Sequence, residues 1–260
     1  MCGVINEGDG SMLNAKRQIS KPLIKMVLFL VFGLLALEIF QQPTSALQKG
    51  VQTQKVVYLT FDDGPSPRYT PKVLDILRKE HVSATFFVLG FKAAQYPQLV
   101  RRIYHEGHEL GNHGYYHTFI VNKSKQWVES DIRKTDVVVQ AVCGVKPKYF
   151  RPPGGILSKA DVGLVVKAGH SIAMWTVDTN DWKGLSAPVI VEAATQRVTA
   201  NSVILMHDGL VTSQSTATAL PVIIHKLRAK GYGFAVLPKQ FQGPSLGGAP
   251  DSTNYRFKRS

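Results

Sequence analysis

Asp62 and Asp63 are adjacent acids that directly follow an apolar run at residues 56–61. β-Branched, aromatic and aliphatic residues in such a run are typical of a strand buried on both faces, and Gly64 and Pro65 turn the chain at its end. Two like charges side by side at the end of a buried strand need either a bound cation or a raised pKa in one of them. The pair therefore indicates a metal ligand or a general base, with a plain Asp-Asp-Gly-Pro surface turn as the alternative.

His113 and His117 stand four residues apart in a glycine-containing loop that follows a short strand-like segment. Together with one carboxylate of the aspartate pair, they make the two-histidine, one-carboxylate set that holds a catalytic divalent ion and leaves positions open for water and substrate. Zinc lowers the pKa of a bound water to about 7, which supplies hydroxide near neutral pH. One acid would then bind the ion while the other accepts a proton. A structural histidine pair is the alternative.

These groups need a frame that brings them together, and residues 54–240 alternate strand-like and helix-like segments. We expect strands at residues 56–61, 84–89, 109–112, 149–151, 171–175, 202–206 and 233–237. We expect helices at residues 71–80, 92–106, 125–142, 159–168, 188–199 and 217–230. Repeated strand–helix units predict a parallel sheet, open or closed into a barrel, whose post-strand loops share one face. Other polar residues also follow strands, so we expect them at this face: Arg151, Asp178, Asp181, His207 and Asp208.

The N-terminal region has the pattern of an export or anchoring segment. Residues 1–22 are polar and basic. Residues 23–40 are apolar apart from Lys25 and Glu38 near the ends, and they are just long enough to cross a bilayer core as a helix. We therefore predict a transmembrane anchor or signal peptide at 23–40, with the N-terminus in the cytoplasm. A linker is expected at 41–53, the folded domain at 54–240 and a disordered basic tail at 241–260. The domain would be extracytoplasmic, on a single-pass anchor, or secreted if the chain is cleaved near Ala46.

The formal net charge is +13, and residues 48–240 alone hold 24 Lys and Arg against 14 Asp and Glu. Such an excess favours an anionic partner, whether nucleic acid, a membrane surface or a cell-wall polymer. The sequence carries no nucleic-acid-binding motif, so we expect no nucleic-acid partner. Cys2 and Cys143 lie on opposite sides of the apolar segment, so the exported part would form no internal disulfide. We expect a monomer that is stabilised by its core.

Five short motifs follow one another along the chain: TFDDGP at 60–65, HxxxH at 113–117, RPP at 151–153, DxxDW at 178–182 and LMH at 205–207. In this order they resemble the five motifs of the polysaccharide deacetylases, the NodB homology domain of carbohydrate esterase family four. The resemblance covers about residues 54–240. It implies an α/β fold, a distorted (β/α) barrel of about seven parallel strands, and hydrolysis of an N-acetyl group on an amino sugar.

The resemblance also implies catalytic roles for the matching residues. Asp62 would be the general base, held by Arg151. His207 would be the general acid that protonates the leaving amine. An acid of the fourth motif, Asp181 in preference to Asp178, would set the protonation state of His207 and raise its pKa. Arg151 and the metal would lower the pKa of Asp62.

The metal ligands implied by the resemblance are Asp63, His113 and His117, with zinc as the expected ion and cobalt, manganese or nickel as alternatives. The substrate contacts implied are Gly154, Trp182 and Leu205. In related enzymes the backbone N–H at the position of Gly154 helps to hold the oxyanion.

Two positions depart from the family pattern. The family usually has Ser or Thr where this chain has Gly114, and an aromatic residue where it has Gly154. We expect catalysis to be retained, while the loop loses a bracing hydroxyl and the groove loses an aromatic wall. Trp175 and Trp182 would be candidates for a replacement stacking surface.

We expect a metal-dependent deacetylase that acts outside the cytoplasm on an N-acetylated glycan, and bacterial peptidoglycan suits a tethered, basic enzyme. Chitin oligomers, another exopolysaccharide and an O-acetyl ester on xylan are alternatives within this class. The alternative from another class is a non-catalytic glycan-binding wall protein on the same scaffold.

Overall fold

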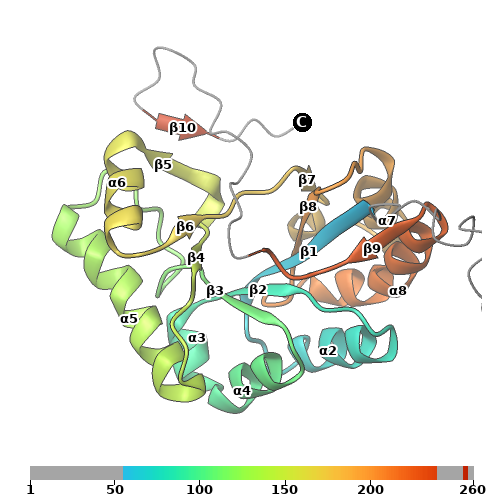
Figure 1. Ribbon diagram of the computed structural model, residues 1–260, viewed down its shortest axis with the longest axis horizontal. Helices are drawn as coiled ribbons and strands as arrows, with labels where there is room; N and C mark the ends of the chain where they lie inside the picture. Colours follow the sequence, from blue (N-terminus) through green and yellow to red (C-terminus); the bar gives the residue numbers. More distant parts are fainter. Residues whose placement is uncertain (1–54, 239–253, 257–260) are drawn as a thin grey trace, which may run out of the picture. The chain divides into compact units, whose positions relative to one another are not determined.

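A computed structural model describes residues 55–238 and 254–256, and one parallel sheet forms its centre (Figure 1). Seven strands follow one another in the order β6-β4-β3-β2-β1-β8-β7, and β9 pairs with the start of β1. Their bounds are β1 (Lys55–Gly64), β2 (Thr85–Val88), β3 (Glu109–Asn112), β4 (Tyr149–Phe150), β6 (Ser171–Ile172), β7 (Val177–Asp178), β8 (Val203–His207) and β9 (Tyr232–Phe234). The end strands β6 and β7 do not pair with each other within the described part of the chain, so the sheet curls into an open half-barrel.

Helices cover the outer, convex side of the curled sheet (Figure 1). They are α2 (Thr70–Lys79), α3 (Gly90–Gln95), α4 (Pro97–His105), α5 (Lys125–Cys143), α6 (Lys159–Lys167), α7 (Ala187–Gln196) and α8 (Ser213–Ala229). In α2, for example, Val73, Leu74 and Leu77 are fully buried, and this helical spacing turns one apolar face towards the sheet. Two short 3-10 turns, η2 (Pro153–Gly155) and η3 (Asp181–Lys183), lie in loops that follow strands.

Strand β1 is buried along most of its length, and its two faces serve different purposes. Val57, Leu59 and Phe61 belong to the main core under the helices. The alternate side chains of Thr60 and Asp62 face the other way, because successive strand residues point to opposite faces. Both hydrogen-bond to the guanidinium of Arg151, which is itself fully buried. The interior of the half-barrel is therefore polar at the level where β1 ends.

The strand register brings the ends of the central strands to one level. Asp62 of β1 pairs with Phe87 of β2 on one side and with His207 of β8 on the other. On the far side of β2, Val88 pairs with Asn112 of β3. Since all these pairs are parallel, the residues that follow β1, β3 and β8 emerge at the same edge of the sheet.

Several of the observed elements differ from the predicted ones. The helix expected at 92–106 is split into α3 and α4, because Pro97 disfavours helical geometry at Tyr96, where φ is −125° and ψ is 57°. The strand expected at 171–175 ends at Ile172, and the carbonyls of Ala173 and Met174 instead accept hydrogen bonds from Arg151. The short strand β7 was not expected.

In the terminal regions, the predictions can be compared with the structure only at residues 254–256. A disordered tail was expected at 241–260, and three of its residues, Asn254–Arg256, form strand β10, which pairs antiparallel with β5 (Ile156–Ser158). The predicted segments at 1–22, 23–40 and 41–53 lie outside the described residues. Among the residues that are described, no helix is long and apolar enough to cross a membrane.

Candidate active site

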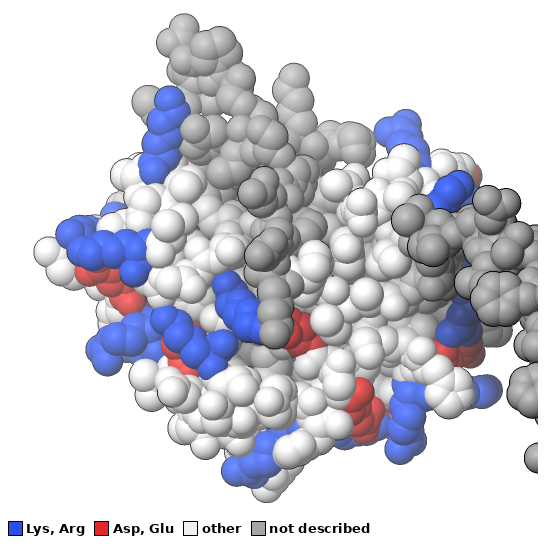
Figure 2. All heavy atoms as spheres, in the orientation of Figure 1, with Lys and Arg blue, Asp and Glu red and all other residues white. Residues whose placement is uncertain are grey.

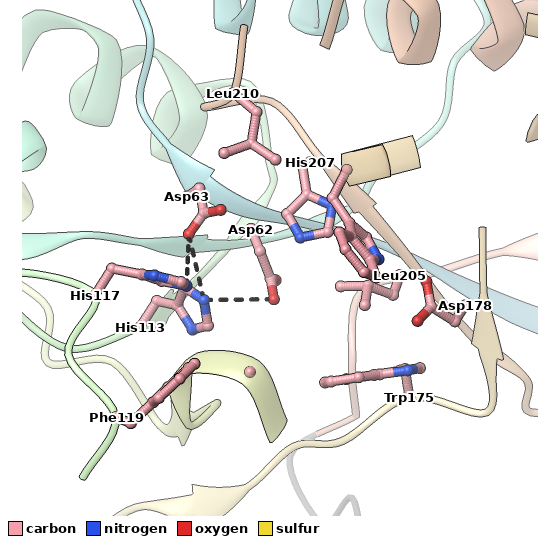
Figure 3. A pocket seen from close by; sticks show the side chains of 12 residues that line it. Asp62, Asp63, His113, His117, Phe119, Trp175, Asp178, Leu205, His207 and Leu210 are labelled. Atoms are coloured by element: carbon pink, nitrogen blue, oxygen red, sulfur yellow. Dashed lines mark ion pairs between the residues drawn. The ribbon is translucent and has the colours of Figure 1, made fainter. Parts of the chain in front are cut away.

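A cavity of about 310 Å³ opens at the edge of the sheet where β1, β3 and β8 end (Figure 3). It is lined by Asp62, Asp63, His113, His117, Phe119, Gly154, Trp175, Asp178, Trp182, Leu205, His207 and Leu210. The structure thus gathers the predicted base, acid, metal ligands and substrate contacts around one space. Phe119 and Leu210 were not predicted, and Trp175 was predicted as a candidate stacking surface.

Asp62 is buried and is held from inside the half-barrel by Arg151. Nη1 of Arg151 donates to Oδ1 of Asp62 at 2.7 Å and to Oγ1 of Thr60 at 2.9 Å, and Nε donates to the Ala173 carbonyl at 2.9 Å. Arg151 lowers the pKa of Asp62, as expected, but the burial of the carboxylate opposes this effect. Burial raises that pKa by more than the guanidinium lowers it. The fixed carboxylate is therefore a stronger base than an exposed aspartate.

His113, His117 and Asp63 meet beside Asp62. Nε2 of His113 lies 3.5 Å and Nε2 of His117 lies 3.2 Å from Oδ1 of Asp63. Nδ1 of His113 lies 2.7 Å from the carbonyl of Arg151, so this nitrogen carries the proton and Nε2 presents a lone pair. Burial lowers the pKa of His113 to about 3, which keeps its imidazole neutral.

This cluster fits a divalent cation. Each of the three residues offers one ligand atom, and these atoms lie within 4.8 Å of one another. Oδ1 of Asp63 is buried and has no hydrogen-bond partner among the described residues. A buried anionic oxygen without a hydrogen bond, facing the lone pair of a neutral imidazole, is costly unless a cation sits between them. Two imidazoles and one carboxylate are donors that zinc and similar ions accept.

The loop that carries both histidines is braced by helix α5. Asn112 accepts from the Gly114 N–H at 2.8 Å and donates to Asp136 at 2.8 Å, while Asp131 accepts from the Tyr115 N–H at 3.0 Å. These supports were not predicted, because α5 mixes polar and apolar residues and its sequence does not reveal that Asp131 and Asp136 are buried. The carboxylate of Asp131 takes over the bracing that a hydroxyl at position 114 would provide.

A side chain introduced at position 114 is therefore expected to destabilise the protein. Gly114 has a φ of 78°, and a Cβ placed there would lie 2.8 Å from Oδ2 of Asp131. Gly144 is a matched control, since its φ is 74° and nothing lies within 4 Å of the added Cβ. We expect Gly144→Ala to cost about 1 kcal/mol and Gly114→Ala at least about 2 kcal/mol of unfolding free energy, measured by denaturant titration. Equal losses in the two variants would contradict the contact with Asp131.

His207 stands on the other side of Asp62 and is backed by Asp181. Nδ1 of His207 lies 2.8 Å from Oδ1 of Asp181, whose other oxygen accepts from the His207 N–H at 2.8 Å and the Thr216 hydroxyl at 2.7 Å. Burial alone would lower the pKa of His207. The hydrogen bond and charge of Asp181, helped by Asp62 and Asp63, outweigh burial and raise that pKa to about 9. The imidazole is thus held protonated in the neutral range.

The two other acids of this region, Asp178 and Asp208, accept hydrogen bonds from other residues than His207. Asp178 lines the cavity, and its Oδ1 accepts from the Asn180 N–H at 2.8 Å, which stabilises the turn before η3. Asp208 is fully buried behind the site, where its carboxylate accepts a hydrogen bond from the Thr70 hydroxyl. Burial raises the pKa of Asp208 to about 7. Of the two fourth-motif acids, the structure places Asp181 against His207.

Comparison with known proteins gives the same family as the motifs. The family model described as polysaccharide deacetylase matches residues 49–171. A peptidoglycan-N-acetylglucosamine deacetylase of Bacillus cereus is 39% identical over 196 residues, which are 74% of this chain and 70% of the relative. A chitooligosaccharide deacetylase of Sinorhizobium fredii is 35% identical, over 70% of this chain and 90% of the relative.

A solved structure shows that the likeness extends to the fold. The crystal structure of a peptidoglycan N-acetylglucosamine deacetylase superposes with a TM-score of 0.70 at 38% identity, covering 74% of this chain and 90% of that one. The family that the motifs predicted is thereby confirmed. The chain belongs to the polysaccharide deacetylase family, carbohydrate esterase family four.

Proposed function

We propose that this deacetylase removes N-acetyl groups from N-acetylglucosamine units of bacterial peptidoglycan. The observation that carries the proposal is the placement of a buried carboxylate and a protonated imidazole on either side of one cavity. Asp62 is fixed by Arg151, and His207 is fixed by Asp181. Amide hydrolysis needs both a base and an acid, with separated pKa values, in the same site.

The proposed metal site would be formed by Asp63, His113 and His117, with zinc as the first candidate. A divalent ion held there supplies Lewis acidity to the amide carbonyl and to the attacking water. Asp62 is placed to take a proton from that water, because its carboxylate lies next to the cluster, 3.7 Å from Nε2 of His113. Asp62 is therefore assigned as the base and Asp63 as the ligand.

His207 is assigned as the acid that protonates the leaving amine. Its Nδ1 is engaged by Asp181, so Nε2 is the nitrogen left to face the cavity. An amine leaves an amide poorly unless its nitrogen is protonated, and an imidazolium with a raised pKa retains the proton until the bond breaks. Gly154 also lines the cavity, and its backbone N–H is assigned to the oxyanion.

The acid assignment predicts a change in pH dependence. Wild-type kcat/KM should fall on the alkaline side as His207 loses its proton, since its pKa is about 9. Asp181→Asn removes the charge that raises this pKa, so the alkaline limb should move to lower pH by about 1 unit or more. Asp178→Asn is the control and should leave the limb in place. An unmoved limb in folded, metal-loaded Asp181→Asn would contradict the pairing of Asp181 with His207.

Peptidoglycan is preferred as the substrate on two grounds. The Bacillus cereus relative is named a peptidoglycan-N-acetylglucosamine deacetylase. Residues 55–238 carry 22 Lys and Arg against 14 Asp and Glu. On the face drawn in Figure 2 the basic side chains lie mainly around the margin, interspersed with acids, and do not form one patch. Such a diffuse positive field suits an extended anionic wall better than a single anionic ligand.

Chitin oligomers are the second candidate substrate, because the Sinorhizobium fredii relative is named a chitooligosaccharide deacetylase. Mass spectrometry of peptidoglycan fragments and chitin oligomers after incubation with the protein separates the two. We expect peptidoglycan fragments to exchange an acetyl group for hydrogen faster than chitin oligomers of equal length. A faster loss from chitin oligomers would overturn the preference.

A peptidoglycan substrate places the catalytic domain outside the cytoplasmic membrane, which agrees with an export or anchor segment at 23–40. Cell fractionation followed by protease treatment of intact cells tests this placement. We expect the domain to be degraded in intact cells if it is anchored, or to appear in the medium if the chain is cleaved near Ala46. A domain protected until the cells are lysed would contradict the proposed location.

A further inference from the structure

Phe119 forms one wall of the cavity directly against the backbone of Gly154. A Cβ placed on Gly154 would lie 2.6 Å from Cε1, 3.3 Å from Cζ and 3.4 Å from Cδ1 of Phe119. Three ring atoms thus lie within contact distance of that one point, and the ring occupies the space of a side chain at position 154. An aromatic residue at 154 and a phenylalanine at 119 exclude each other in this arrangement.

Trp175 stands on the other side of the same turn. A Cβ placed on Gly155 would lie 2.6 Å from Cη2 of Trp175. Figure 3 shows Phe119 and Trp175 below Asp62, on either side of the short turn η2. The two glycines that follow Arg-Pro-Pro therefore leave room for two rings, which come from different loops and enclose the approach to the catalytic groups.

The ring of Phe119 is exposed although its backbone is anchored. Phe119 is 53% exposed, whereas the next residue, Ile120, is fully buried in a cluster with Val128, Ile132 and Phe150. The ring adds to the apolar part of the cavity lining, which also includes Trp175, Trp182 and Leu205, and pockets lined mainly by apolar and aromatic side chains are typical of ligand-binding sites. His117 of the metal-binding cluster lies two residues earlier, and both side chains line the same cavity.

We propose that Phe119 is the stacking platform for the pyranose ring of the N-acetylhexosamine unit that is deacetylated. This inference rests on the proposed function and names the residue that positions its substrate. A pyranose with equatorial substituents presents axial C–H bonds on its faces, and such a face packs on an aromatic ring. The aromatic wall of the cavity is thus supplied by Phe119, in the loop after the second histidine. Gly154 has no side chain that would occupy the space of this ring.

Three variants test this role by steady-state kinetics on N-acetylglucosamine oligomers. Phe119→Ala should raise KM about tenfold and leave kcat within about twofold, because a platform binds the ground state and the transition state alike. Phe119→Tyr keeps the ring and should stay near wild type. Tyr116→Ala removes a 61% exposed ring from the same loop that does not line the cavity, and should leave KM unchanged.

A further test moves the aromatic ring from position 119 to position 154. Gly154→Tyr alone should weaken substrate binding, because the new side chain meets the ring of Phe119 and because the φ of 66° at this position favours glycine. Phe119→Ala combined with Gly154→Tyr should recover at least part of the lost affinity, since the ring is now supplied from position 154. Failure of the double variant to improve on Phe119→Ala, with the fold intact, would contradict an interchangeable wall.

Measurements of oligomer binding and of metal content test the role of Phe119 separately from the proposed chemistry. Calorimetry of oligomer binding to metal-free protein should show a Kd about tenfold weaker in Phe119→Ala, whether or not the wild type releases acetate. If the wild type binds but releases none, the proposed function fails while the platform stands. An unchanged Kd and KM in Phe119→Ala would overturn the platform, as would loss of the metal from that variant.

Discussion

Asp62→Asn is expected to retain the bound metal while kcat falls by about 100-fold or more, the usual contribution of a positioned base. The amide has the shape of the carboxylate and its oxygen can still accept from Arg151, but it cannot take a proton from water. Turnover and metal content should be measured on the same preparation, the latter by atomic emission. Asp63→Asn is the matched control, since it alters the adjacent acid and should release the metal.

This variant should also unfold at a lower temperature than the wild type. Arg151 is fully buried, and Asp62 is its carboxylate partner among the described residues. Breaking a buried ion pair from one side is costly, and we expect a loss of about 3 kcal/mol. Rates must therefore be compared per folded molecule at a temperature below both transitions. If Asp62→Asn released the metal and Asp63→Asn kept it, the roles of the two acids would be reversed.

His117→Ala is expected to lose both the metal and the activity, and His113→Ala likewise. An open site with three protein ligands has no spare donor. His117 gives the cleaner test, because its side chain is 39% exposed and its removal leaves no closed cavity. His113 is buried and donates to the Arg151 carbonyl, so its removal also disturbs the half-barrel interior.

His225→Ala is the control for these variants. His225 is exposed and contacts Glu80, which is distant from it in the sequence. It should retain metal and activity. Metal titration of each apo protein with zinc, followed by calorimetry, gives the affinities directly. Wild-type affinity in either His113→Ala or His117→Ala would remove that residue from the ligand set.

The sequence predicts the strands of the sheet and the polar residues that follow them. The apolar run before Asp62 and the placement of each polar group after a strand are local patterns, and a parallel sheet brings such positions to one edge. For this reason the polar lining of the cavity could be predicted. Asp181 and His207 lie 26 residues apart, and their contact follows from β8 running beside the loop that contains η3.

The remaining features depend on contacts that no local pattern encodes. The raised pKa of Asp62 results from its complete burial, which outweighs the charge of Arg151, and burial is a property of the whole fold. Phe119 reads as an ordinary loop residue until the turn at Gly154 is placed against it. Asp131 likewise reads as one helix residue among many, because its contact with the histidine loop spans the distance between α5 and β3.

Acetate release from N-acetylglucosamine oligomers and peptidoglycan fragments, with and without a chelator, tests the central claim most directly. We predict that the purified domain releases acetate, that the chelator abolishes the release, and that zinc added in excess of the chelator restores it. His117→Ala, assayed in parallel, should release none under any of these conditions. Oligomer binding without acetate release in the metal-loaded wild type, or release that the chelator leaves unchanged, would contradict a metal-dependent deacetylase.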